Sequence, residues 1–187
     1  MSVSDTIKNQ FANTLKELLN TTPFDKVTVI KICEKSGIGR QTFYNHFKDK
    51  YDLASWIYYT ETRTIFNDFQ HHRDWGRVIC LIFCHFLDNK NFYQQIAKDS
   101  SQNSFSNYLV KHTRDYYIEA IQANSTNTEI DGELLYTVEF NTYGAVNMSL
   151  KWINGGMIEK PEEMSRMMVK NMPQDLRKYM ISEQSDR

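Results

Sequence analysis

The chain has 187 residues, of which 41% are hydrophobic, seven are glycine and three are proline. This composition excludes a disordered chain and argues against an all-β protein rich in tight turns. Residues 1–50 hold eight Lys and Arg against five Asp and Glu, whereas residues 51–187 hold fourteen against eighteen, so a basic N-terminal part is joined to an acidic body. This uneven charge favours a polyanion as the partner of the N-terminal part.

The first predicted helix follows Ser4, which is a suitable N-cap residue. Hydrophobic residues recur within it at steps of three and four: Ile7, Phe11, Leu15, Leu18 and Leu19. The run "NTTPFDK" (20–26) ends this helix, because Pro23 cannot continue it.

Two short helices follow, with a glycine-containing turn between them. Thr28 is the expected N-cap of the second helix, and Gly37 its end. Residues 40–47 form the third helix, and Asp49 is the expected N-cap of a fourth. Short helices joined in this way have the sequence outline of a helix-turn-helix, which we place at about residues 28–47.

Longer helices are predicted beyond residue 70, near 74–88, 91–98, 104–123, 130–154 and 161–181. Pro173 is expected to kink or restart the last of them. The sequence therefore predicts an all-α fold, with an N-terminal three-helix unit (1–50) joined to a larger helical bundle (51–187).

The third helix has two contrasting faces on a helical wheel. Phe43 and Phe47 share the face that points to the core. The opposite face and its flanks hold hydrogen-bonding side chains, none of them acidic: Arg40, Gln41, Thr42, Tyr44, Asn45, His46 and Lys48. A helix in the DNA major groove needs such groups for base edges and phosphates. The alternative is an ordinary solvated surface, but the uneven charge of the chain favours DNA.

The segment "TVIKICEKSGIGRQTFYNHFKDKYDL" (28–53) resembles the DNA-binding signature of the TetR family of bacterial transcription regulators. The positions in register are Thr28, Ile32, Gly37, Thr42, Tyr44, Phe47, Lys50 and Leu53. The resemblance implies that Thr42, Tyr44 and Lys50 contact phosphates and that Arg40, Gln41 and Asn45 read bases. The expected DNA-binding set is Thr28, Arg40, Gln41, Thr42, Tyr44, Asn45, His46, Lys48 and Lys50. Gly39 departs from the family, because it replaces the usual serine cap of the recognition helix.

The segment "NTYGAVNMSLKWINGGMIEKPEEMSRMM" (141–168) resembles the last two long helices of a TetR subgroup that includes activators of dihydroxyacetone kinase operons. The resemblance implies a homodimer in which these helices pair with their copies, and hence a near-palindromic operator. The expected interface residues are Leu135, Val138, Tyr143, Val146, Leu150, Met164 and Met168. Residues 51–187 would then serve effector sensing and dimerisation, and residues 1–50 DNA binding.

Cys33, Cys80 and Cys84 are an odd number, the chain start lacks the pattern of a signal peptide, and the longest apolar run (78–87) is about half a membrane span. We therefore expect a reduced, cytoplasmic protein with no membrane partner. Cys80, Cys84 and His85 with His71–His72 could suggest a metal site. Core packing is favoured, because apolar residues surround the cysteines, and we expect no metal and no cofactor.

No nucleophile elbow, phosphate loop or HExxH motif stands in the sequence, so we expect no catalytic site and no enzyme. The resemblance implies a repressor whose operator binding is relieved by a signal in residues 51–187. An activator that works through a partner protein is the alternative, and an interaction adaptor without DNA binding is a remote one. The effector, a small molecule or a partner protein, is not identified. An aromatic stripe could line its pocket, although such stripes are more often part of the core: Phe105, Tyr108, Tyr116, Tyr136, Phe140 and Tyr143, with Trp75 or Phe83 opposite.

Overall fold

The computed structural model describes residues 2–72, 74–98, 104–125 and 129–181. Within these residues the chain forms ten α-helices, one 3-10 turn and no strand, which confirms the all-α class. The elements are α1 (Val3–Leu18), η1 (Phe24–Lys26), α2 (Val29–Ser36), α3 (Arg40–His46), α4 (Lys50–His72), α5 (Trp75–Asp88), α6 (Lys90–Ile96), α7 (Phe105–Asn124), α8 (Gly132–Asn154), α9 (Pro161–Lys170) and α10 (Gln174–Met180).

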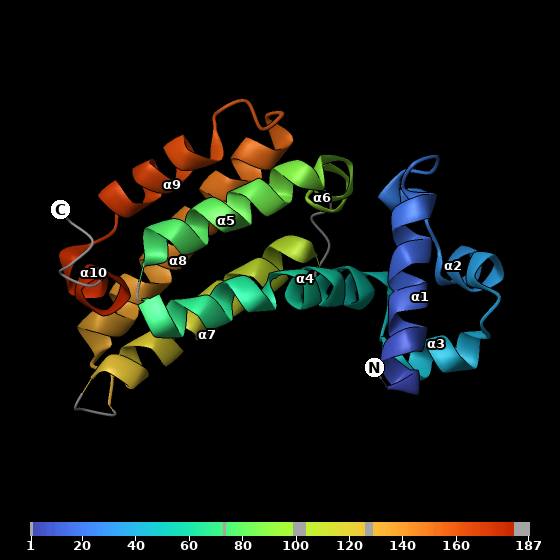
Figure 1. Cartoon of the computed structure of the whole chain (residues 1–187), viewed down its shortest axis with the longest axis horizontal. Coiled ribbons are helices and arrows are strands. Elements are labelled where there is room, and N and C mark those ends of the chain that lie inside the picture. The colour runs from blue at the N-terminus through green and yellow to red at the C-terminus, as the bar shows by residue number, and fades with distance from the viewer. Residues whose placement is uncertain (1, 73, 99–103, 126–128, 182–187) are drawn as a thin grey trace.

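The elements α1, η1, α2 and α3 form a small unit at one end of the molecule, which we call the head (Figure 1). Its core is aromatic: the rings of Phe11 and Phe43 meet edge to face with centroids 5.1 Å apart, and Phe47 packs against both. The cap of α1 was predicted wrongly. Ser2, not Ser4, accepts the N–H of Asp5, and Asp5 accepts the N–H of Ser2 in return.

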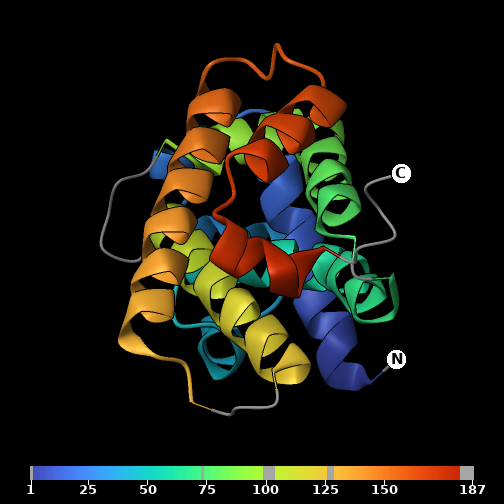
Figure 2. The same ribbon diagram turned by 90° about the vertical axis from the view of Figure 1, so that its left-hand side faces the viewer.

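The remaining helices form the body, and α4 runs from the head along it (Figure 1). Helix α9 packs on α5, helix α8 packs on α7, and α10 contacts both α7 and α8. Figure 2 shows α8 and α9 on one side of the body, joined by the turn that follows Gly155. Pro173 separates α9 from α10, so the last predicted helix is restarted rather than continuous.

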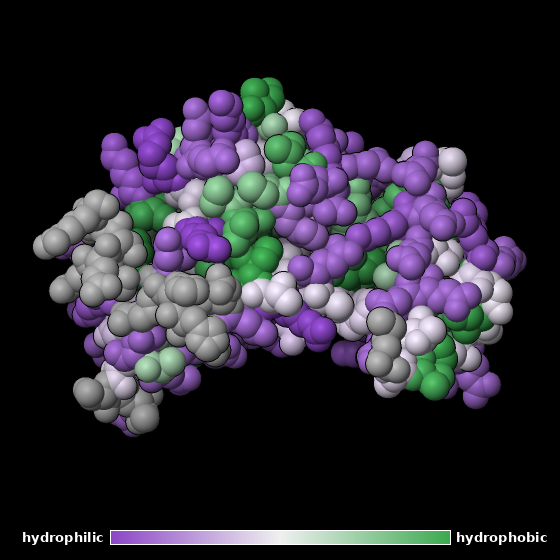
Figure 3. Space-filling model, in the orientation of Figure 1, coloured by the Kyte–Doolittle hydropathy of each residue, from purple (hydrophilic) through white to green (hydrophobic). Residues whose placement is uncertain are grey.

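The surface in the view of Figure 3 is mostly hydrophilic, with apolar residues gathered over the middle of the body. Across the described ranges, no helix combines the length and the apolar character that crossing a membrane requires.

Candidate functional site

Helix α3 is held in place by one face and leaves the other in solvent. Phe43 is fully buried between Phe11 and Phe47, whereas Tyr44, the next residue, is 52% exposed. Gly39 is the N-cap and makes no side-chain cap hydrogen bond, so the sequence was right that the helix lacks a serine-type cap. The N–H of Phe43 still donates to the carbonyl of Gly39.

The outer face of α3 brings together most of the side chains predicted for DNA. Arg40, Gln41, Asn45 and Lys48 are exposed, and Thr42 and His46 are half-buried. The first turn contains no acidic residue. Such a face can donate hydrogen bonds to phosphates and base edges without charge repulsion. Thr28 lies apart from it at the start of α2, where its hydroxyl accepts the N–H of Lys31.

Lys50 does not present its ammonium group to solvent as a free phosphate ligand. Its Nζ donates to the carbonyl oxygens of Phe24 at 2.7 Å, Val27 at 3.0 Å and Asp25 at 3.3 Å. It also lies 4.6 Å from the centre of the Phe24 ring. An ammonium group has three protons to donate, and these contacts use all three. In this structure Lys50 therefore binds η1 to the start of α4.

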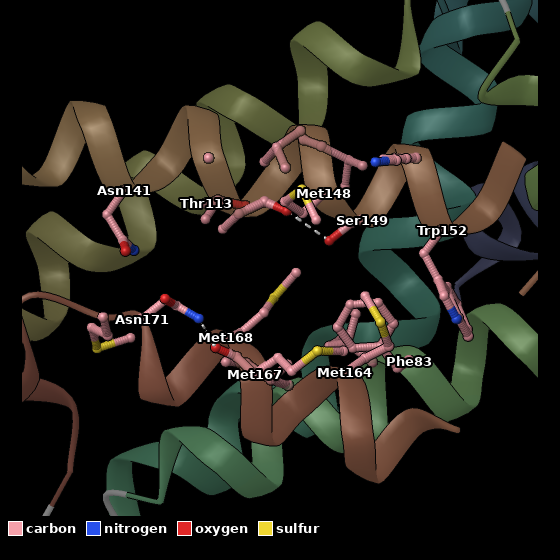
Figure 4. A pocket seen from close by; sticks show the side chains of 18 of the residues that line it. Phe83, Thr113, Asn141, Met148, Ser149, Trp152, Met164, Met167, Met168 and Asn171 are labelled. Atoms are coloured by element: carbon pink, nitrogen blue, oxygen red, sulfur yellow. Dashed lines mark hydrogen bonds between the residues drawn. The ribbon is translucent and has the colours of Figure 1, made fainter. Parts of the chain in front are cut away.

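A cavity of about 850 Å³ lies between α8 and α9, with α5 and α7 beneath. Figure 4 shows Met148, Ser149 and Trp152 from α8 facing Met164, Met167 and Met168 from α9, with Met168 pointing into the space between the helices. Phe83 lies at its Trp152 end, with ring centroids 4.9 Å apart.

The polar groups of this cavity are few and mostly uncharged. The hydroxyl of Ser149 donates to the carbonyl of Ala145, and the amide of Asn141 donates to the hydroxyl of Tyr117. Lys151 and Glu159, the charged residues of the lining, are both exposed. The interior therefore suits an uncharged, mainly apolar molecule, because a buried unpaired charge would be strongly destabilised.

The aromatic stripe, weighed above as core or pocket lining, divides between three places. Phe140 lines the cavity, as do Trp75 and Phe83 from the opposite side. Phe105 is buried in the core, Tyr108 and Tyr116 are half-buried against it, and Tyr136 is exposed. Met164 and Met168 of α9 were predicted to lie in an interface, and sequence reasoning missed that they line this cavity together with Met167.

The predicted dimer-interface residues also divide. Val138, Val146 and Met164 are buried within the chain, so they offer little surface to a second copy. Leu135, Leu150 and Met168 are half-buried, and Tyr143 is 54% exposed. A different stripe of α8 is apolar and exposed. It consists of Tyr136, Phe140 and Tyr143, and the rings of its first two residues stack 6.5 Å apart.

All three cysteines are free thiols, Cys33 buried and the other two half-buried. Burial raises the pKa of Cys33 and of Cys80, which keeps these sulfurs protonated. The side chains of His71 and His72 lie outside the described residues. Among the residues that are described, no three His, Cys, Asp or Glu side chains lie close enough to hold a metal ion.

Two family models match the chain. Residues 13–55 match the family described as bacterial regulatory proteins, tetR family. Residues 73–174 match the transcriptional regulator C-terminal region of the same family, TetR_C_8.

A curated relative is 31% identical over 85 residues, the HTH-type dhaKLM operon transcriptional activator DhaS of Lactococcus lactis subsp. lactis (strain IL1403). The aligned part covers 46% of this chain and 46% of the relative, so the chain spans just under half the length of the curated relative it matches. This match confirms that the chain is similar in sequence to an activator of this kind, as the resemblance of residues 141–168 led us to expect.

Solved structures share the fold at low identity. A dihydroxyacetone kinase operon activator DhaS has a TM-score of 0.62 at 21% identity, over 88% of this chain and 93% of that one. A TetR transcriptional regulator from Streptococcus agalactiae 2603V has a TM-score of 0.60 at 14% identity, over 91% of this chain and 96% of that one. Thermus thermophilus FadR, a TetR-family repressor in complex with lauroyl-CoA, has a TM-score of 0.59 at 12% identity, over 88% of this chain and 92% of that one.

Proposed function

Because the chain belongs to the TetR family of bacterial transcriptional regulators, we propose that it regulates transcription by placing α3 in the major groove of an operator. The single observation that carries this proposal is the pair of neighbours Phe43 and Tyr44: the first is fully buried and the second half in solvent. This arrangement fixes the polar face of α3 outward on a rigid support, as groove docking requires.

We assign the contacts by chemistry. Gln41 and Asn45, whose amides can both donate and accept, would read base edges together with Arg40. Thr42, Tyr44 and Lys48 would contact phosphates. His46 borders this surface and Thr28 lies apart from it at the start of α2, and we assign both to phosphates. Lys50 is assigned instead to positioning the head, because its ammonium group already binds three carbonyl oxygens.

We propose that the protein acts as a homodimer in the cytoplasm, with residues 1–50 as the DNA-binding domain and residues 51–187 as the sensing and dimerisation domain. The exposed stripe Tyr136, Phe140 and Tyr143 supports this, because a row of large apolar side chains in solvent marks an interaction surface. Phe140→Arg should yield monomers in light scattering, whereas Glu119→Arg, at an exposed position of α7, should leave dimers. If light scattering finds that the wild-type protein is a monomer, the proposed homodimer is wrong.

The cavity between α8 and α9 is the proposed effector site, and its chemistry favours an uncharged, mainly apolar molecule. We propose repression relieved by this ligand as the main mode. Activation through a partner protein is the second candidate, because the 31%-identical relative is named as an activator. No enzymatic role is part of the proposal.

The function is tested by selecting duplexes from a random DNA library with the purified protein. We expect a near-palindromic consensus with two half-sites about one helical turn or somewhat more apart. A reporter driven by a promoter that carries this site then separates repression from activation, since deletion of the gene raises expression in the first case and lowers it in the second. Recovery of no consensus would contradict the proposal.

A further inference from the structure

The cavity between α8 and α9 differs in chemistry between its two ends. Asn141 and Trp152 both line it, and at about 1.5 Å per residue they stand about 16 Å apart along the axis of α8. At the Trp152 end the neighbours are the apolar side chains of Phe83 and Met164, whereas Asn171 of α9 lies near Asn141 at the other end (Figure 4). The cavity is therefore elongated, with an apolar end and a polar end.

The polar end brings together three uncharged side chains from two helices. Helix α7 supplies Thr113 and Tyr117, which share a face because they are four residues apart. Helix α8 supplies Asn141, whose side chain points toward the space between α8 and α9 (Figure 4). All three line the cavity, and the amide nitrogen of Asn141 donates to the hydroxyl oxygen of Tyr117 at 3.0 Å. This hydrogen bond fixes the Tyr117 hydroxyl at the polar end.

The hydroxyl of Tyr117 keeps its own proton for a further partner. Tyr117 is only 2% exposed, and burial raises its pKa to about 12, so the proton stays on the oxygen at neutral pH. The indole of Trp75 packs on its ring with centroids 5.4 Å apart, but an indole can only donate. Among the hydrogen bonds that the described residues make, none uses the Tyr117 hydroxyl as its donor. A buried donor of this kind is costly unless a bound molecule accepts its proton.

The count of protons holds for either orientation of the Asn141 amide. If the amide were turned over, its oxygen would accept the proton of Tyr117, and both protons of its nitrogen would need other acceptors. In both cases the pair makes one mutual hydrogen bond and keeps two protons to donate. The polar end therefore offers hydrogen-bond donors to a molecule that fills the cavity.

Thr113 adds a second hydroxyl one turn before Tyr117. Threonines in helices commonly donate to the carbonyl four residues earlier, as Thr62 does to Tyr58 at 2.7 Å. The hydroxyl of Thr113 makes no such hydrogen bond in the part of the chain that the structure describes, and its side chain is half-buried in the lining. A carbonyl oxygen has two lone pairs, so it can accept from Thr113 as well as from Tyr117.

The polar end carries no charge of its own. Of the described residues that line the cavity, Lys151 and Glu159 are the charged ones; they belong to the other end of α8 and the turn after it, and both are exposed. Arg114 and Glu139, from α7 and α8, pair with each other outside the lining. A carboxylate or an ammonium group at the polar end would therefore lack the counter-ion that a buried charge requires.

We propose that the cavity binds a neutral, mainly apolar molecule that carries a carbonyl oxygen, which is to say a ketone, an ester or a lactone. The carbonyl oxygen accepts the proton of Tyr117, with Thr113 as a second donor, and Asn141 positions the Tyr117 hydroxyl. The apolar part lies along α8 toward Trp152, between Phe83 and the methionines of α9. That this molecule is the effector rests on the proposed function, whereas its binding does not.

The proposal is tested with Prodan, a neutral naphthyl ketone whose fluorescence moves to longer wavelength when its carbonyl accepts a hydrogen bond. We expect it to bind the wild-type protein saturably. Tyr117→Phe, which removes only the hydroxyl, should weaken the binding of Prodan about tenfold and move the emission of the bound dye to shorter wavelength. N-phenyl-1-naphthylamine, an apolar probe without a carbonyl, should bind the two proteins with affinities within about twofold of each other.

Tyr108→Phe is the matched control, because Tyr108 is a half-buried tyrosine of the same helix that lies outside the lining. It should leave the binding of both probes unchanged. The proposal is overturned if the wild-type protein does not bind Prodan, or if Tyr117→Phe binds Prodan within about twofold of wild type. An equal loss of both probes in Tyr117→Phe would also overturn it, because such a loss reports a change of shape rather than a missing donor.

The preference for a neutral ligand is tested by displacement of Prodan from the wild-type protein. Methyl octanoate and octanoate share the same acyl chain, and only octanoate is charged at about pH 7.5. We expect the ester to displace Prodan at a concentration at least about tenfold lower than octanoate does, and equal displacement would overturn the proposal. If the carbonyl compounds bind as expected but leave the affinity of the protein for its selected duplex unchanged, the proposed effector role is wrong and the carbonyl site stands.

Discussion

The ammonium nitrogen of Lys50 lies 2.7 Å from the carbonyl oxygen of Phe24, a residue 26 positions earlier in the chain. Two more carbonyl oxygens, of Asp25 and Val27, complete its contacts. These oxygens would otherwise need water at a crowded, partly buried junction. Lys50 thus acts first as a structural residue of the head.

Lys50→Met should therefore lower the stability of the head, by about 1–3 kcal/mol, because partly buried carbonyls lose a charged donor. Denaturant unfolding followed by the fluorescence of Trp56, which packs on Phe47 in this region, measures the change. Lys48→Ala is the matched control, since Lys48 is exposed. It should leave stability unchanged and reduce the salt dependence of DNA binding by about one phosphate contact. Equal stability of the two variants would contradict the structural role of Lys50.

Gly39→Ser should stabilise α3. The backbone of Gly39 is extended, with φ −64° and ψ 151°, and a Cβ placed there meets no heavy atom within 4 Å. A serine can therefore supply the missing cap hydrogen bond, for a gain of a few tenths of a kcal/mol. The measurement is the denaturant midpoint, with Gly39→Ala as the control that adds the Cβ without the hydroxyl. The explanation fails if alanine stabilises as much as serine.

His112 should make stability depend on pH. Burial lowers its pKa below the ordinary value of 6.5, against a weaker opposing effect of Asp115, and its ring stacks on Tyr108. The unfolded chain then binds a proton more readily than the folded one, so the free energy of unfolding falls as pH drops through the region below 6.5. His112→Phe should remove this contribution. The melting temperature of the variant minus that of the wild type should therefore be larger at about pH 5 than at about pH 7.5. A difference that does not change with pH would refute the assignment.

The cavity between α8 and α9 should bind an uncharged apolar probe. We expect N-phenyl-1-naphthylamine to bind saturably with one molecule per chain, because the lining is methionine and aromatic and its charged residues are exposed. Ser149→Trp should fill the space and abolish the fluorescence increase, whereas Lys111→Trp, at an exposed position of α7 outside the lining, should not. Binding that both variants retain would place the dye elsewhere.

The two faces of α3 could be predicted from the sequence, because helical periodicity alone separates Phe43 and Phe47 from the polar side chains around Tyr44. Thr28 and Gly37 were also predicted correctly as the ends of α2, since each acts through its own local chemistry. The cap of α1 was missed by two residues. Ser2 is preferred because Asp5 stands three positions later and completes a reciprocal pair, which Ile7 could not do for Ser4.

The interface that we propose on α8 could not be predicted in the same way. Helix α8 is apolar on more than one side, and the spacing of Val138 and Val146 does not reveal whether a stripe is covered by α7 or by a second copy. Burial within the chain decides it. The role of Lys50 depends on carbonyls 23 to 26 residues away, which no local pattern indicates.

The most direct test of the account is the affinity of Tyr44→Ala for the duplex selected by the wild-type protein. Tyr44 is half exposed on the groove face, so its loss should leave the fold intact and weaken binding to every duplex sequence to a similar extent. We predict a loss of about tenfold, with an unchanged circular dichroism spectrum and melting temperature. Affinity within about twofold of wild type in a folded variant would contradict the docking of α3 in the groove.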